Sequence, residues 1–194
     1  RYAMSRWRPC MRTTRKPDRM KVLKTREVAL MRWLFAVLCL SIATFSSANA
    51  TPNLNGKTID KVLVVKATRQ LHLISHGQTL KSYRISLGKQ PKGAKMREGD
   101  KRTPEGFYWL DWRKTSENYN LAMHISYPNS RDKAQAAKQG VSAGSMIMIH
   151  GTPVDEEYPE WYFKTLDWTN GCIAMSNTDM REVWNLVKDG TLIE

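Results

Sequence analysis

Alternating apolar and polar residues between positions 69 and 87 constrain the fold most strongly. Residues 69–75 and 79–87 each place apolar side chains at every second position, as a strand with one buried face does. His76-Gly77-Gln78 separates the two segments and is typical of a turn. The stretch therefore predicts a β-hairpin.

Further short segments along the chain also have strand character. Apolar and β-branched runs predict strands over residues 61–66, 107–112, 121–127 and 146–149. Residues 89–101 are rich in Gly, Lys and Pro, which predicts a surface loop. Strands therefore dominate the expected structure.

Helical patterns are few. Residues 132–139 are rich in Ala and Lys and precede Gly140, which predicts a short helix with a glycine stop. A clearer helix should begin at Ser176, with Lys188 in its last turn and Gly190 after it. Its apolar positions recur at helical spacing: Met180, Val183, Trp184 and Val187. We expect a mostly β domain with appended helices.

The front of the chain has the pattern of an export signal. An apolar stretch from Leu34 to Phe45 follows basic residues, and Ala48-Asn49-Ala50 supplies the small residues of a cleavage site. The stretch is shorter than the ~20 residues that a membrane-spanning helix needs. We predict a signal peptide cut after Ala50, a lead-in over residues 51–60 and one catalytic domain over residues 61–194.

The start of translation is left open. Residue 1 is Arg, and Met20 and Met31 are both possible starts, so residues 1–19 could be upstream sequence. We therefore exclude residues 1–50 from the prediction of the fold.

The positive charge of the chain is concentrated in its front part. The net charge is +13, yet residues 1–50 carry 11 Lys and Arg against 2 Asp and Glu, and residues 51–194 carry 20 against 16. No Lys/Arg run with interleaved aromatic residues follows residue 50, which disfavours nucleic-acid binding. The mild positive charge that remains suits an anionic polymer.

Cys172 is the only cysteine after residue 50, so it has no intramolecular disulfide partner. A lone cysteine in an exported protein is a reactive thiol, an intermolecular partner or a small buried hydrophobe. Gly171 before it would let the backbone approach a substrate, and the N–H groups of Gly171 and Cys172 could face a reacting carbonyl oxygen. Upstream, His150 ends an apolar run and is the kind of residue that activates a thiol.

These residues resemble the catalytic signature of the YkuD-type L,D-transpeptidases. The signature is a His-Gly pair, a spacer, then Ser or Thr, one residue and Gly-Cys, matched here by His150-Gly151 and Thr169-Asn170-Gly171-Cys172. Residues 99–106, 125–129 and 176–191 extend the match, and Asp167 to Ala174 is similar to the YafK-like branch. The chain departs from the common branch at Asn170 and Ala174 and in its longer spacer.

The resemblance implies a β-sandwich-like L,D-transpeptidase catalytic fold and a periplasmic cysteine enzyme. Cys172 would attack a peptidoglycan stem peptide and form a thioester, with His150 as base. An amine of a second stem, a protein lysine or water would resolve it. Transfer, hydrolysis by a murein endopeptidase or amidase, and a non-catalytic wall-binding module all stay open.

The resemblance also implies the surroundings of the thiol. Substrate-binding residues would be His124, Gly151, Thr169 and Asn170. A wall-linked lipoprotein is a further expected partner, the protein would be a monomer, and only the signal peptide would meet the membrane. No cofactor is expected, and no metal, because the histidines lack metal-ligand spacing.

Between His150 and Cys172 lies an insertion rich in aromatic and acidic residues. Its aromatic residues are Tyr158, Trp161, Tyr162 and Trp168, and Asp155, Glu156 and Glu157 precede them. Two interpretations stay open: a lid over the cleft, or a well-packed loop.

Overall fold

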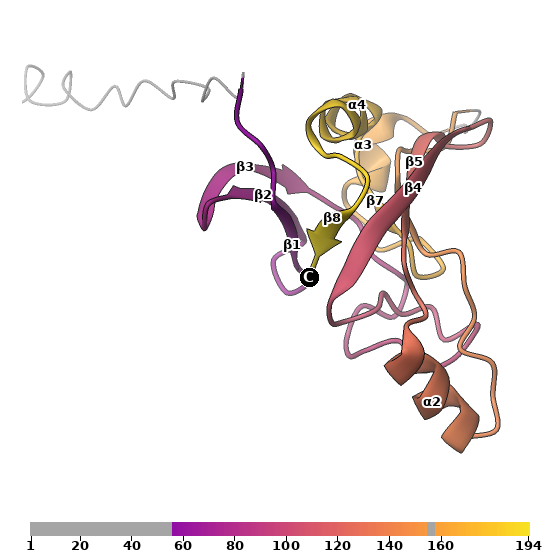
Figure 1. Ribbon diagram of the computed structural model, residues 1–194. Coiled ribbons are helices and arrows are strands. Elements are labelled where there is room, and N and C mark those ends of the chain that lie inside the picture. Colours follow the sequence, from indigo (N-terminus) through magenta and orange to yellow (C-terminus); the bar gives the residue numbers. More distant parts are fainter. Residues whose placement is uncertain (1–55, 155–157) are drawn as a thin grey trace, which may run out of the picture. The chain divides into compact units, whose positions relative to one another are not determined.

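The computed structural model describes residues 56–154 and 158–194, which belong to one compact unit, Pro52–Glu194 (Figure 1). The predicted signal peptide, the first half of the predicted lead-in (residues 51–55) and the acidic residues 155–157 lie outside the described residues. No helix in the described part is long and apolar enough to cross a membrane.

The predicted hairpin is confirmed and is extended by a third strand. Strands β1 (Lys61–Val65), β2 (Gln70–Ser75) and β3 (Gln78–Arg84) pair antiparallel in chain order. The β2–β3 register shifts between Leu73 and Ile74, because β3 carries one extra residue, Leu80, at this point. Strand β2 itself pairs regularly with β1, so Ile74 lies on the other face from Leu73, as alternation predicts, and is buried there outside the main core cluster.

The remaining strands complete one mixed sheet of eight strands in the order β3-β2-β1-β8-β4-β5-β6-β7. They are β4 (Tyr108–Ser116), β5 (Asn120–Ile125), β6 (Met148–His150), β7 (Ile173–Ala174) and β8 (Thr191–Ile193). The last strand of the chain, β8, enters the middle of the sheet, parallel to β1 and antiparallel to β4. The mostly β fold predicted from the sequence is confirmed.

The two edges of the sheet approach each other. Beyond β3 the chain forms isolated bridges from Ser86 to Ala174 and from Gly88 to Thr169, next to the β7 edge. Ser86 and Ala174 exchange two backbone hydrogen bonds of 2.8 and 2.9 Å. The sheet therefore curls around its core, and the segment that carries Cys172 is tied to the segment that follows the hairpin.

Two of the three helices in the described part begin at a side-chain cap. Helix α2 (Ser130–Lys138) begins with a capping box between Asn129 and Asp132. Helix α3 (Glu160–Phe163) is a single turn, and α4 (Asn177–Leu186) begins at Ser176, whose side chain accepts the Asp179 N–H.

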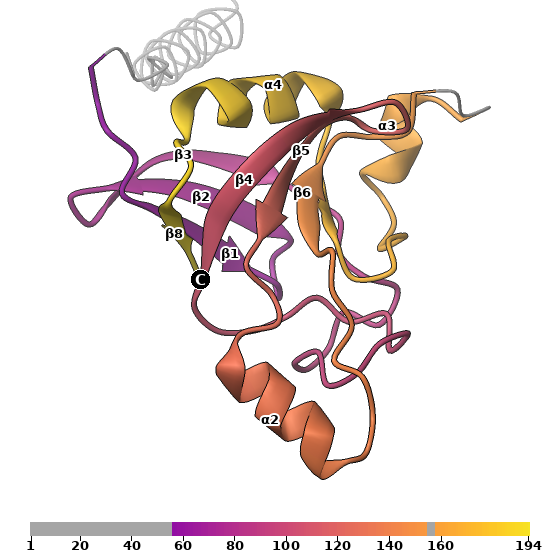
Figure 2. The same cartoon turned by 45° about the vertical axis from the view of Figure 1, so that its right-hand side comes forward.

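Helix α4 places Met180 and Val183 in the core, as predicted, and lies at the opposite end of the domain from α2 (Figure 2). The prediction that Lys188 lies in its last turn is wrong, because the helix ends at Leu186 and Val187 is extended. Gly190 has a φ of +84° in the turn to β8, a conformation that glycine adopts readily.

Candidate active site

The loop before β7 is fixed at its start by Asp167. The Asp167 carboxylate accepts hydrogen bonds from Arg69 Nε and Nη2, the shortest of 2.7 Å, and a third from the Leu87 N–H at 3.0 Å. Arg69 precedes β2 and Leu87 follows β3. The hairpin therefore sets where the Cys172 loop begins.

Thr169 braces the turn that presents Cys172. Its buried Oγ1 accepts the Gly171 N–H at 3.1 Å and donates to the Cys172 carbonyl at 2.7 Å. Gly171 has a φ of +133°, and a Cβ there would lie 2.8 Å from the Arg102 carbonyl oxygen. The close approach that requires this glycine is thus to Arg102, whereas the sequence predicted an approach to substrate.

Replacing Thr169 with Val should lower the free energy of unfolding by about 2 kcal/mol, because two buried backbone groups lose their partner. Thermal and denaturant unfolding measure this. Thr165→Val is the matched control, since the exposed Thr165 hydroxyl bonds only to the Tyr162 carbonyl in the same loop. An equal loss of unfolding free energy in Thr169→Val and Thr165→Val would contradict the proposal that Thr169 stabilises the Cys172 turn.

His150 ends strand β6 and is 5% exposed. Its Nδ1 lies 2.7 Å from the Gly151 carbonyl oxygen, which can only accept, so Nδ1 must carry the proton and Nε2 is the basic nitrogen. The Tyr119 ring stacks obliquely on the imidazole at 4.4 Å between centroids, and Trp168 meets it edge-on at 5.6 Å. The carbonyl and the two rings fix the orientation of the imidazole.

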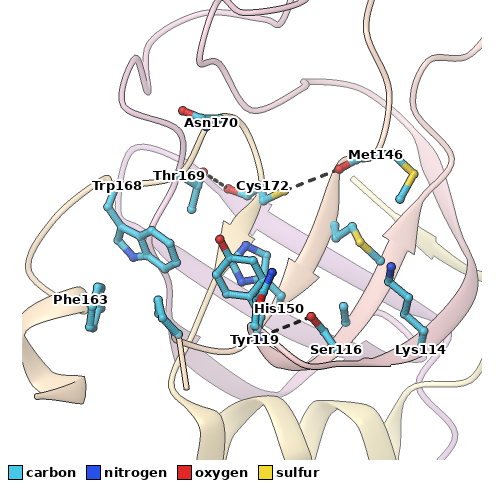
Figure 3. A pocket seen from close by; sticks show the side chains of 14 residues that line it. Lys114, Ser116, Tyr119, Met146, His150, Phe163, Trp168, Thr169, Asn170 and Cys172 are labelled. Atoms are coloured by element: carbon cyan, nitrogen blue, oxygen red, sulfur yellow. Dashed lines mark hydrogen bonds between the residues drawn. The ribbon is translucent and has the colours of Figure 1, made fainter. Parts of the chain in front are cut away.

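Cys172 and His150 line one cavity of about 510 Å³ together with Thr169 and Asn170 (Figure 3). Strands β4, β5 and β6, the β4–β5 turn, α3 and the Cys172 loop all contribute to its wall. The other lining residues are Lys114, Ser116, Asn118, Tyr119, Ala122, Met146, Met148, Pro153, Phe163 and Trp168. The structure therefore brings together four of the predicted site residues.

The surroundings of the Cys172 thiol and of the His150 imidazole favour the neutral form of each group. Burial raises the pKa of the Cys172 thiol, only partly offset by the Met148 N–H and by Lys95, and burial lowers the pKa of His150. The thiol also donates to the Met146 carbonyl oxygen at 3.7 Å, a bond that favours its protonated form. If His150 activates the thiol, as the sequence suggests, it must do so by taking the proton during attack, because the surroundings raise the pKa of Cys172.

Alkylation of Cys172 by iodoacetamide should consequently show its inflection above the ordinary thiol pKa of about 8.5. Rates measured between pH 6 and pH 11 test this, with the Cys172→Ala variant as the blank. An inflection near pH 7 or below would show a thiolate–imidazolium pair at rest instead.

Other predicted site residues lie elsewhere. Gly151 is buried behind His150, where a Cβ would meet the Asn177 Oδ1, so it does not face the cavity. His124 is absent from the cavity wall and instead bonds to Asp111 at 2.7 Å and stacks on Trp112. The Gly171 N–H is already bonded to Thr169, so only the Cys172 N–H is retained as an oxyanion donor.

The sequence did not indicate the roles of Tyr119 and Lys114. Tyr119 lies in the β4–β5 turn, and Lys114 is the only Lys or Arg among the described residues that line the cavity. Because both positions depend on how β4 and β5 pair, no local pattern marks them. Within residues 56–154 and 158–194, no three His, Cys, Asp or Glu side chains lie where they could hold a metal ion.

Of the aromatic insertion, Phe163 and Trp168 form part of the cavity wall. Trp161 and Tyr158 are exposed, 64% and 53%, and Tyr158 stacks on Tyr162 at 4.7 Å. The described part of the insertion is therefore a packed wall with an exposed outer side, and the lid interpretation stays a prediction.

Residues 59–194 match the model of the YkuD family, the L,D-transpeptidase catalytic domain. The chain belongs to this family. YafK of Escherichia coli K12, a provisionally named L,D-transpeptidase, is 30% identical over 177 residues, which cover 84% of this chain and 64% of YafK. The chain thus spans less than two thirds of the length of that relative.

Solved structures of similar fold include two bacterial proteins. The helical cell shape determining protein Pgp2 of Campylobacter jejuni is 27% identical with a TM-score of 0.53, over 74% of this chain and 52% of Pgp2. Bd1075 of Bdellovibrio bacteriovorus is 24% identical with a TM-score of 0.51, over 72% of this chain and 48% of Bd1075. The second likeness concerns the fold alone.

Proposed function

We propose that this L,D-transpeptidase domain catalyses cysteine-dependent acyl transfer on peptidoglycan stem peptides, with Cys172 as nucleophile and His150 as base. The observation that carries the proposal is that both residues line one cavity, while Gly151 holds the His150 Nδ1 proton and leaves Nε2 as the base. Family membership supplies the substrate class.

In the first half-reaction the Cys172 sulfur attacks the carbonyl at the L-centre of diaminopimelate, and His150 Nε2 takes the thiol proton. The C–S bond forms, the C–N bond to D-Ala breaks, and the imidazolium returns its proton to the departing amine. Because both groups start neutral, proton transfer accompanies attack. The thiol must first leave the Met146 carbonyl.

The oxyanion of the tetrahedral intermediate needs a donor. The Cys172 N–H is the candidate, because the Gly171 N–H is bonded to Thr169. In the second half-reaction an amine or water gives its proton to His150 and attacks the thioester carbonyl, and the thiolate leaves and is reprotonated.

A second cavity supports transfer over hydrolysis. It has a volume of about 520 Å³ and shares Met146 and Asn170 with the first cavity, so the two meet beside Cys172. One cavity could hold the acyl donor while the other admits an acceptor amine. Hydrolysis stays the alternative, since water needs no such site.

Mass analysis of the products formed from purified muropeptides in ¹⁸O-labelled water tests this choice. Transfer predicts cross-linked products without the label. Label incorporated into a free tripeptide carboxylate, without cross-links at high acceptor concentration, would instead establish a hydrolase.

Lys114 should bind a carboxylate of the stem peptide, because it lines the cavity and no Asp or Glu among the described residues lines it. Lys114→Met should raise KM about fivefold, equivalent to roughly 1 kcal/mol for a partly exposed ion pair, with kcat nearly unchanged. Steady-state kinetics on free and amidated stem peptides measure this.

The effect of Lys114→Met should vanish for the peptide whose terminal carboxylate is amidated. Lys138→Met, on α2, is the matched control. An equal rise in KM for the free and the amidated peptide would contradict the proposed ion pair.

We further propose that the enzyme acts in the periplasm after export through its predicted signal peptide. Family membership and the similarity to Pgp2, named as a cell shape determinant, support a role in wall metabolism and cell shape. A stem-linked lipoprotein is a candidate second substrate, because its attachment would present the same type of acyl group to Cys172.

A further inference from the structure

Large aromatic side chains lie exposed along β4 and at the residue just before it. Phe107, Trp109 and Trp112 are 64%, 53% and 37% exposed. We call these three residues the aromatic row. Exposed aromatic residues grouped in this way are typical of binding sites, whereas scattered single ones are not.

A β-bulge turns Trp112 outward. Leu110 pairs with Ile125 and Arg113 with Met123, so two residues of β4, Asp111 and Trp112, lie opposite His124 alone. The His124 ring stacks on Trp112 at 4.6 Å with an interplanar angle of 10°, and its Nδ1 bonds to Asp111 at 2.7 Å. Trp112 is thereby held with one face covered, while 37% of the residue remains exposed.

The aromatic row shares a sheet face with the cavity. Leu110, Met123 and Ile125 are buried on the core face, so Trp109 and His124 lie on the opposite one. Lys114 pairs with Ala122 on that same outer face, and both line the cavity. At about 3.3 Å per residue, Trp109 and Lys114 lie roughly 15 Å apart along β4.

We propose that the aromatic row binds sugar rings of the glycan strand from which the stem peptide extends. The inference rests on the proposed function for the identity of the polymer. Flat indole rings pack against the apolar faces of pyranose rings, and Asp111 beside them, with a 41% exposed side chain, can accept hydrogen bonds from hydroxyl or amide groups. A peptide in the cavity would place its attached glycan along β4.

A second copy of the chain fits the aromatic row less well than a glycan strand does. The exposed fractions of the three residues correspond to on the order of 350 Å² of surface. A stable dimer needs about 800 Å² from each partner. Stacking of individual rings requires only a narrow row, which suits a linear polymer.

The test uses the full chain with the Cys172→Ala substitution, so that no turnover is needed. The probe is a soluble β-1,4-linked tetramer of N-acetylglucosamine, which has no stem peptide. Calorimetric titration should show binding, with the affinity lowered about tenfold by Trp112→Ala or Trp109→Ala and much less by Trp112→Phe. Trp161→Ala is the control, because Trp161, at 64% exposed, is more exposed than either Trp of the aromatic row but lies on α3.

A second measurement uses the active enzyme. Trp112→Ala should raise KM for a disaccharide-linked stem peptide and leave KM for the free stem peptide unchanged. The proposal is overturned if the tetramer does not bind, if Trp161→Ala weakens binding as much, or if sedimentation shows that the Trp substitutions dissociate a dimer. If the glycan-binding tests fail but the enzyme still turns over the free stem peptide normally, the glycan proposal is wrong and the proposed function is unaffected.

Discussion

Replacing Cys172 with Ala will abolish turnover of stem peptides while leaving the domain folded. Without the sulfur no thioester can form, and residual rates should fall at least about 10⁴-fold, as for the loss of other covalent nucleophiles. Cys172 is only partly buried, and its thiol donates a single long hydrogen bond, to the Met146 carbonyl oxygen at 3.7 Å. Stability should therefore change by less than about 1 kcal/mol.

Release of D-Ala from a purified stem tetrapeptide measures the effect, and thermal unfolding checks the fold. Cys172→Ser is the conservative partner, and it should also be inactive because a hydroxyl is a much weaker nucleophile beside a neutral imidazole. Turnover of the Ala variant within tenfold of the parent would show that another residue carries the acyl group.

Replacing His150 with Gln should lower kcat by about 10²- to 10⁴-fold, the usual contribution of a general base. Gln can still donate to the Gly151 carbonyl, but it offers no basic nitrogen. The resting thiol is already protonated, so its alkylation inflection should move little. A large fall in kcat with an almost unchanged thiol pKa would identify His150 as a base that acts during attack.

The His150→Gln variant should also differ from the parent in how its free energy of unfolding depends on pH. Burial lowers the pKa of His150 in the folded protein, so the unfolded chain binds more protons below about pH 6.5 and the folded state loses stability as the pH falls. His150→Gln should lack this loss, whereas His72→Gln, on the hairpin away from the cavity, should retain it. Unfolding curves at pH 7 and pH 5 that shift equally in all three proteins would contradict the buried, neutral histidine.

Local sequence patterns correctly predicted the elements whose contacts are local. The hairpin over β2 and β3 and the apolar face of α4 follow from the spacing of their own residues. Strand β8 was missed because three residues carry no periodicity, and its place between β1 and β4 is set by long-range pairing. The bulge at Leu80 of β3 likewise cannot be predicted from the alternation of apolar residues.

The loop over residues 89–101 shows how tertiary contacts override composition. It has no regular strand, as predicted, yet Lys95 is 6% exposed and pairs with Asp100 at 2.8 Å. Burial alone would raise the pKa of Asp100, but Lys95 and the backbone N–H groups of Met96, Arg102 and Arg97 lower it. A Lys-rich loop therefore contains a buried ion pair.

In the candidate site the sequence predicted the two reacting residues, Cys172 and His150. Their preferred protonation states follow from burial, which the sequence does not show. Cys172 and His150 line one cavity, in agreement with the motif, but the same burial raises the pKa of the thiol and lowers that of the imidazole. The roles of Tyr119 over the imidazole and of Thr169 behind Gly171 depend on segments that meet only in the folded sheet.

The most direct test of the account is the mass of the acyl-enzyme. The full chain is mixed with stem tetrapeptide, quenched in acid within milliseconds to seconds, and analysed as intact protein and as peptides. The account predicts a mass increase equal to the stem tripeptide acyl group, located on Cys172, with one D-Ala released for each adduct. Release of D-Ala by the parent with no covalent adduct at any time, or an adduct on another residue, would contradict it.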